Sequence, residues 1–328
     1  MSPDQAKKEL RARIAVTSQR VTIAKALLLE STGTEATNVD TLLEGVLKNN
    51  GARWPLPSLV IHESVDTMSI VKEIAEAVSW RLAAIEATWS LIHSGLLFSM
   101  SGTRDQEVTI NWTTVAPGSG GGVSSGFRMP ETSLPVPERV RRAPSFDQHR
   151  TQLLAEPDLY LHTFGVSNMH AQVAESFAEA VLCFRAELYT AATAMLGRAS
   201  EGAWLELGDS LLRLIPATEA KKFAKQREVL EDPMLGPMKK VAAVIQLYEH
   251  QEIFEPVLRA SEVKLPELRA IANWTDAVRD SRNTIHFGVE AAVPNTYEKL
   301  GVLLLGAVPN VRTLYRIKAA ADAASRGP

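Results

Sequence analysis

The chain has 328 residues, of which 45% are hydrophobic and 22% charged, and its formal net charge is −3. This length suits about two domains of roughly 150 residues, and the composition is that of a globular protein with a sizeable core. Residues 1–150 carry 16 basic and 16 acidic side chains, and the rest carry 19 and 22. These counts exclude a polycationic nucleic-acid-binding domain, so any RNA or DNA site must be a local patch.

Cysteine usage and apolar patterning point to the cytoplasm. Cys183 is the only cysteine, so one chain can form neither a disulfide framework nor a cysteine-based metal cluster. The N-terminus lacks the apolar core of a signal peptide, and no apolar stretch is long enough to span a bilayer. We expect a cytoplasmic protein with no membrane association, no metal and no cofactor.

The first half of the chain predicts helices followed by a β-hairpin. Apolar spacing predicts helices over 4–31, 40–49 and 69–98. The alternation in 108–115 predicts a strand, the Gly/Ser-rich segment 117–126 a flexible tip, and Phe127-Arg-Met the return strand. This α+β arrangement over residues 1–128 loosely resembles a winged-helix domain. The resemblance implies a sensing or interaction domain that meets a partner protein or nucleic acid.

Residues 129–148 are predicted to be a linker. The segment is rich in proline and carries Arg139, Arg141 and Arg142. Proline restricts the backbone and removes amide donors, which favours an extended spacer over a regular element.

Residues 149–328 predict an all-α domain. A long helix is predicted over 171–196, and further helices follow, separated by prolines, over 197–214, 221–230, 236–254, 265–286 and 295–324. Because the breaks are short, neighbouring helices should pack antiparallel in a bundle.

A polar stripe near the end of one predicted helix is the strongest functional pattern. Arg279, Arg282, Asn283 and His286 stand at offsets of 0, 3, 4 and 7, which fall along one face of an α-helix. Guanidiniums suit phosphate oxygens, and His286 is the side chain of the set that titrates near neutral pH. Asn283 can orient the imidazole or the phosphate. The stripe can therefore hold a phosphodiester and move a proton beside it.

The segment Val278-Arg-Asp-Ser-Arg-Asn-Thr-Ile-His-Phe-Gly288 resembles the signature helix of the HEPN superfamily, the all-helical domains of prokaryotic toxins and antiviral-defence nucleases. That signature is an arginine, usually followed by a polar residue, with a histidine four to six residues further on. Arg279 precedes His286 by six intervening residues. The Arg282-Asn283 pair matches the family's Arg-Asn dipeptide but has three residues before His286, so both arginines stay candidates.

The resemblance extends over roughly residues 150–325, although only residues 279–288 carry it. The upstream helix over 183–201 also resembles the long, small-residue-rich helix that packs against the signature helix in that family. The resemblance implies a metal-independent endoribonuclease whose site forms between the signature helices of two chains. Under this hypothesis the protein is a homodimeric toxin or antiviral-defence effector, and RNA is its substrate. Glu201 is the candidate for supporting the stripe from the neighbouring helix.

Two structural alternatives stay open. The stripe could belong to a non-catalytic HEPN-like adaptor or regulatory module that dimerises through it. It could also be a buried brace, with Arg279 and Arg282 paired to Asp276, Asp280 or Glu201 and His286 at the helix C-terminus. A DNA-binding regulator that uses the hairpin and the 139–142 arginines is the least supported, because its charge is balanced.

Overall fold

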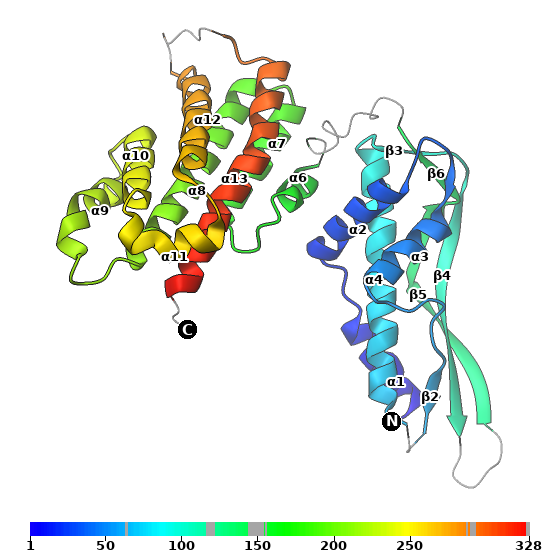
Figure 1. Ribbon diagram of the computed structural model, residues 1–328. Coiled ribbons are helices and arrows are strands. Elements are labelled where there is room, and N and C mark those ends of the chain that lie inside the picture. Colours follow the sequence, from blue (N-terminus) through cyan, green and yellow to red (C-terminus); the bar gives the residue numbers. More distant parts are fainter. Residues whose placement is uncertain are drawn as a thin grey trace. The chain divides into compact units, whose positions relative to one another are not determined.

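The computed structural model divides the chain into two compact units, unit 1 (Met1–His149) and unit 2 (Arg150–Pro328). Helices make up most of unit 2, whereas unit 1 combines helices with all the strands of the described chain (Figure 1). The predicted mainly α class, with an α+β first half, is confirmed. The structure describes residues 1–62, 65–115, 122–143, 154, 156–286, 288 and 293–325.

Unit 1 places its helices before a long hairpin. Its elements are α1 (Pro3–Arg13), α2 (Ser18–Ser31), β1 (Thr37–Asn38), α3 (Val39–Asn49), β2 (Leu59–Ile61), α4 (Thr67–His93), β3 (Leu97–Ser99), β4 (Thr103–Val115), β5 (Gly122–Pro137) and β6 (Arg139–Arg142). The prediction of one helix over 4–31 is wrong, because Thr17 caps a new helix. Its side chain accepts a hydrogen bond from the backbone N–H of Arg20 at 3.3 Å.

The strands form two small sheets. One has the order β1-β6-β3 with antiparallel neighbours, and the other has the order β2-β4-β5. In the second sheet β2 runs parallel to β4, and β4 pairs antiparallel with β5 around a bulge between Gln106 and Val108. The predicted strand over 108–115 and the return strand at 127–129 are confirmed. Residues 117–121 of the flexible tip predicted over 117–126 lie outside the described residues, and the prediction is wrong for residues 122–126, which belong to β5.

The linker predicted over 129–148 is wrong for residues 129–142. This stretch contains the second half of β5 and all of β6. β5 lies at the edge of its sheet, where the missing N–H groups of Pro130, Pro135 and Pro137 are tolerated. Pro135 also accepts a hydrogen bond from the Trp89 indole of α4 at 2.7 Å. Residues 144–148 of the predicted linker lie outside the described chain.

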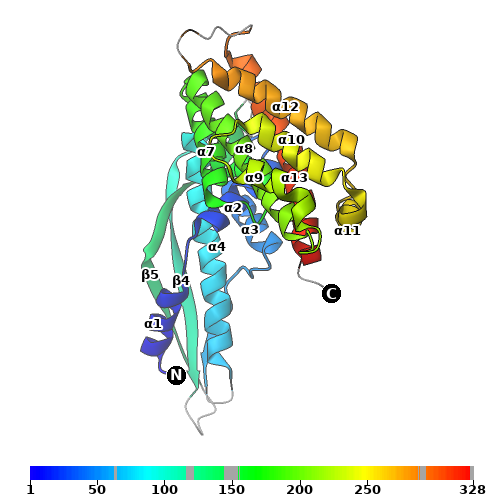
Figure 2. The same ribbon diagram turned by 90° about the vertical axis from the view of Figure 1, so that its left-hand side faces the viewer.

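Helix α4 organises the core of unit 1. It runs along the β4–β5 hairpin (Figure 2) and packs against α1, α2 and α3. The core between α1, α4 and the sheet is aliphatic, with Leu10, Ile74, Val78 and Ile110 buried. The helix predicted to reach Phe98 ends at His93, and Gly95 follows with a φ of +73°, a conformation that glycine adopts readily.

Unit 2 is a helical bundle. Its elements are α6 (Pro157–Thr163), α7 (Ala171–Arg185), α8 (Tyr189–Arg213), the 3₁₀ helix η2 (Ala220–Phe223), α9 (Ala224–Glu231), α10 (Pro237–Tyr248), α11 (Gln251–Ser261), α12 (Leu265–Asn283) and α13 (Tyr297–Ser325). The predicted helix over 171–196 is two helices, because Glu187 adopts a left-handed φ of 59° between α7 and α8.

Helix α8 is the central element of unit 2 and packs against α7, α10, α12 and α13. Trp204 on this helix is buried, and its indole N–H donates to the Thr275 hydroxyl of α12 at 2.8 Å. The part of the 183–201 region that belongs to α8 packs against α12. None of the helices in the described ranges is long and apolar enough to cross a membrane.

Candidate functional site

The polar stripe lies at the C-terminal end of α12, where the chain turns toward α13. Arg279, Arg282 and Asn283 belong to the last turns of α12. His286 lies three residues beyond the helix, and its backbone N–H donates to the Asn283 carbonyl at 3.1 Å. The prediction that the helix extends to residue 286 is therefore wrong. Three of the stripe residues share the helix, and the histidine stands on the turn that follows.

Arg279 is held by carboxylates of its own helix. Its Nη2 lies 3.0 Å from an Asp276 oxygen and 2.8 Å from an Asp280 oxygen. The hydrogen bond to Asp280 raises the pKa of the Arg279 guanidinium. The side chain is one-third exposed, so the pairs lie at the surface and each contributes little to stability, about 0 to 1 kcal/mol.

Arg282 is held between two helices. Its Nη1 lies 3.3 Å from an Oε2 of Glu201 on α8, and each of the two side chains is 27% exposed. The aliphatic part of Arg282 rests on Gly197, one turn before Glu201. A Cβ added to Gly197 would lie 2.7 Å from the Arg282 Cδ, closer than real contacts allow. The absent side chain of Gly197 therefore makes room for Arg282, and the structure brings the predicted supporting residue Glu201 to this arginine.

His286 and Asn283 contrast with the two arginines. The His286 side chain is exposed and Asn283 is half-buried. Within the part of the chain that the structure describes, neither side chain has a hydrogen-bond or ion-pair partner. The imidazole can therefore accept or donate a proton without first breaking a contact to a described group.

A second layer of polar groups, which the sequence analysis missed, fixes the turn after α12. The Asn295 amide donates to the Ser281 carbonyl at 3.1 Å and to the Thr284 hydroxyl at 2.9 Å, and lies 3.4 Å from the Thr193 hydroxyl of α8. Lys299 in turn donates to the Asn295 side-chain oxygen at 3.3 Å. Asn295 thus satisfies a carbonyl that the helix end leaves free. The sequence feature that could have indicated this role is the asparagine that stands between Pro294 and the next helix.

Apolar side chains are exposed around the same end of the bundle. Ile285, Val293 and Tyr297 have exposed fractions of 45%, 57% and 46%. The Tyr297 ring stacks on Phe184 of α7 at a centroid distance of 4.9 Å. α12 ends and α13 begins at one end of the bundle (Figure 1). Exposed apolar groups beside a polar site are typical of a surface that meets a partner.

Comparisons with family models, with curated proteins and with solved structures found no match. The HEPN resemblance therefore depends on the motif residues alone. Among the described residues, no group of three or more His, Cys, Asp or Glu side chains is placed to hold a metal ion.

Proposed function

We propose that this protein is a metal-independent endoribonuclease, a prokaryotic toxin or antiviral-defence effector of the cytoplasm that works as a homodimer. One observation carries the proposal: the His286 imidazole is exposed and has no partner among the described groups, on the turn directly after Arg282 and Asn283. A histidine that served only as a brace within one chain would be paired or packed.

The chemistry asked of the site is transesterification. The ribose O2′ attacks phosphorus and the bond from phosphorus to O5′ breaks, which yields a 2′,3′-cyclic phosphate and a 5′-hydroxyl. The proton of the 2′-hydroxyl passes to a neutral His286, and the leaving O5′ needs a proton from an acid. The His286 of a second copy, in its protonated form, supplies it. Arg279 or Arg282 compensates the charge that builds on the phosphate oxygens.

For an arginine of the stripe to bind an RNA phosphate, its ion pairs with carboxylates must break. Arg282 has one carboxylate partner at 3.3 Å, whereas Arg279 has two at 3.0 Å or less. Replacing one longer ion pair by a contact to a phosphate oxygen costs less free energy than replacing two shorter ion pairs. We therefore assign the phosphate contact to Arg282, with Glu201 as the group that holds it in the absence of RNA.

The test is cleavage of single-stranded RNA by the purified full-length chain in excess EDTA. General acid–base catalysis contributes about 10²- to 10⁴-fold, so His286→Ala should lose at least about 100-fold in rate. His162→Ala, which removes an exposed histidine of α6 in the same unit, is the matched control and should keep the rate. Absence of cleavage by the wild-type chain, or full activity of His286→Ala, contradicts the proposal.

Mixing variants tests whether two copies share the site. Because the proposed site uses the His286 of both copies, a heterodimer of one wild-type and one His286→Ala chain should be as inactive as the His286→Ala homodimer. Excess His286→Ala chain mixed with the wild type should therefore lower the rate per wild-type chain. Activity that grows linearly with enzyme concentration down to a monomeric sample would contradict the shared site.

A second candidate is a non-catalytic dimeric adaptor or regulatory module. The exposed apolar side chains of Ile285, Val293 and Tyr297 favour it, because such residues are enriched where proteins meet. In that case no RNA is cut, and His286→Ala weakens self-association measured by sedimentation.

For unit 1 we propose the sensing or interaction role implied by its winged-helix resemblance, with a protein or nucleic acid as the partner. Arg139 and Arg142 hydrogen-bond the backbone carbonyls of Ala36 and Leu29. These contacts suit a structural role for the two side chains better than contact with DNA phosphates. Duplex binding by unit 1 is therefore the weaker option.

A further inference from the structure

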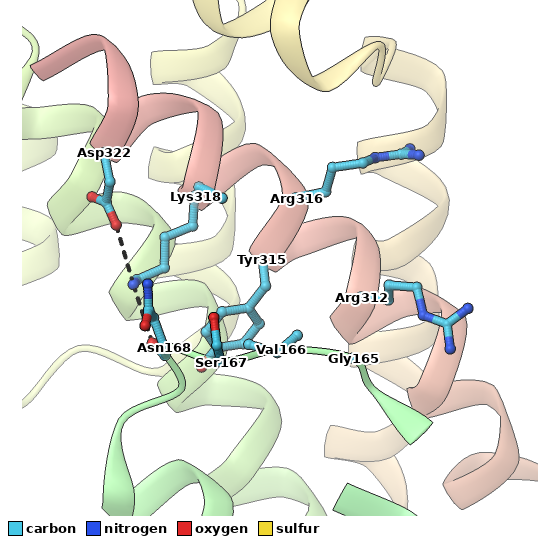
Figure 3. A pocket seen from close by; sticks show the side chains of 10 residues that line it. Gly165, Val166, Ser167, Asn168, Arg312, Tyr315, Arg316, Lys318 and Asp322 are labelled. Carbon is cyan, nitrogen blue, oxygen red and sulfur yellow. Dashed lines mark hydrogen bonds and ion pairs between the residues drawn. The ribbon is translucent and has the colours of Figure 1, made fainter. Parts of the chain in front are cut away.

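A pocket of about 310 Å³ lies in unit 2 between the loop that joins α6 to α7 and the C-terminal half of α13 (Figure 3). Its volume is at the lower end of the range for small-molecule sites, roughly 300 to 1,000 Å³. The loop contributes Gly165, Val166, Ser167 and Asn168, and α13 contributes Arg312, Tyr315, Arg316, Lys318, Ala319 and Asp322.

The loop side of the pocket is held in place by side chains of α8 and α13. Arg312 donates to the carbonyls of Phe164, at 3.3 Å, and Thr163. The backbone N–H of His170 donates to a Glu206 oxygen at 3.0 Å. The pocket is therefore largely formed before any ligand binds, which lowers the entropy cost of binding.

One end of the pocket is electrically balanced. Lys318 lies 3.5 Å from Glu206 and 3.3 Å from Asp322, and Arg213 lies 2.9 Å from Asp322. Tyr315 donates its hydroxyl to Glu206 at 2.5 Å. Two cations and two carboxylates thus neutralise each other, so this end has no charge to offer a ligand.

The other end carries an excess of positive charge. Arg312 and Arg316 stand four residues apart on α13, and neither forms an ion pair with a described carboxylate. Like charges at this spacing destabilise a helix by about 0.2 to 0.5 kcal/mol. The sequence places no acidic residue between Glu298 and Asp322, although the chain as a whole has a net charge of −3. Two guanidiniums at one end of a pocket are the donors that phosphate oxygens prefer.

We propose that this pocket binds a small phosphate monoester, with the phosphate at Arg312 and Arg316. In Figure 3 both arginines extend to the same side of α13, and Tyr315 and Val166 lie between them and the Lys318–Asp322 pair. The organic part of the ligand lies over Val166 and Tyr315, where Ser167 and Asn168 offer hydrogen-bonding groups for hydroxyls. The site is separate from the α12 stripe and does not depend on the proposed nuclease activity.

The test is calorimetric titration of the full-length chain with ribose 5-phosphate, inorganic phosphate, ribose and citrate. Saturable binding is expected for ribose 5-phosphate, weaker binding for inorganic phosphate, and none for ribose. Arg316→Gln should weaken ribose 5-phosphate binding at least tenfold, and Arg316→Lys less. Arg259→Gln, which removes an exposed arginine of α11 paired with Glu255, is the matched control and should leave binding unchanged.

Three outcomes would overturn the proposal: no saturable binding of either phosphate, equal binding of citrate, or an Arg316→Gln chain that binds like Arg259→Gln. Binding only of RNA oligonucleotides would also overturn it, in favour of an RNA surface. A thermal melt of each variant identifies a folding defect. The His286→Ala chain should keep full ribose 5-phosphate binding, so failure of the nuclease proposal and failure of this one are distinguishable.

Discussion

The arginines of α12 and those of α13 lie in the same unit but in opposite electrostatic settings. Arg279 and Arg282 are paired with carboxylates, whereas Arg312 and Arg316 have no described carboxylate partner. A histidine accompanies the first pair, and a buried tyrosine the second. Burial, followed by the hydrogen bond to Glu206, raises the pKa of Tyr315 far above its usual range, so the tyrosine cannot transfer protons near neutral pH. Proton transfer therefore suits the α12 end, and anion binding suits the α13 pocket.

The balanced end of the pocket should show the largest stability effect. Tyr315→Phe removes a hydrogen bond to a charged acceptor that is itself only 17% exposed. Such bonds contribute about 1.5 to 3 kcal/mol, so the free energy of unfolding in urea should fall by that amount. A loss below about 0.5 kcal/mol would mean that Lys318 and the His170 amide alone satisfy Glu206.

The contact between Gly197 and Arg282 should give the next largest effect. Gly197→Ala adds a methyl group where 2.7 Å separates it from Arg282, and overpacking of this kind costs about 1 to 3 kcal/mol. In an Arg282→Ala background the clash is gone, and the same change should stabilise α8 by about 1 kcal/mol through helix propensity. Urea unfolding of the wild type, the two single variants and the double variant measures the change of sign in the effect of Gly197→Ala on the free energy of unfolding. Equal effects in both backgrounds would show that Arg282 moves aside freely.

Asp322 should make the stability of the pocket depend on pH. Burial alone would raise the pKa of Asp322, but hydrogen bonds from Ser210 and Arg213 and the charge of Lys318 together lower it. A carboxylate with a lowered pKa stabilises the fold above its unfolded-state pKa of about 3.9 and loses that stabilisation as the pH falls through the folded value. Asp322→Asn should cost less than about 1 kcal/mol at pH 7 and nothing near pH 2. An equal loss at both pH values would contradict the ionic origin.

The smallest effects should have opposite signs at the two arginine pairs. Arg316→Gln removes a repulsion on α13 and should stabilise the ligand-free chain by about 0.2 to 0.5 kcal/mol. Arg279→Gln removes two surface ion pairs and should destabilise it by up to about 0.5 kcal/mol. Both differences should shrink in 1 M salt, where exposed charges are screened. Thermal melts at low and high salt measure them.

Helix positions and site residues could be predicted where they depend on patterns between residues that are close in the sequence. The spacing of Arg279, Arg282 and Asn283 marks one face of α12, and the structure places them there. The break at Thr17 and the left-handed Glu187 escaped prediction because helix-forming residues surround both. The prolines of β5 led to the wrong prediction of a linker. A strand tolerates proline at the edge of a sheet, and only the tertiary structure decides which strand lies at the edge.

The contacts that organise the site were less predictable. Asn295 lies 14 residues from Ser281 and 102 from Thr193, so no local pattern links them. The pocket likewise joins α13 to a loop about 150 residues earlier in the chain. Glu201 was foreseen as a partner because it follows Gly197 by one helical turn, a spacing that the sequence displays directly.

The close approach of Gly197 to Arg282 also has an evolutionary consequence. A chain that keeps the arginine must keep the smallest residue at position 197, because any side chain there occupies the space that Arg282 fills. The two positions should therefore change together in related sequences, glycine with arginine and larger residues with shorter partners. If selection preserves Arg282 for chemistry, Gly197 should vary as little as His286. If the arginine is only a brace, the two positions should drift as a pair while His286 varies independently.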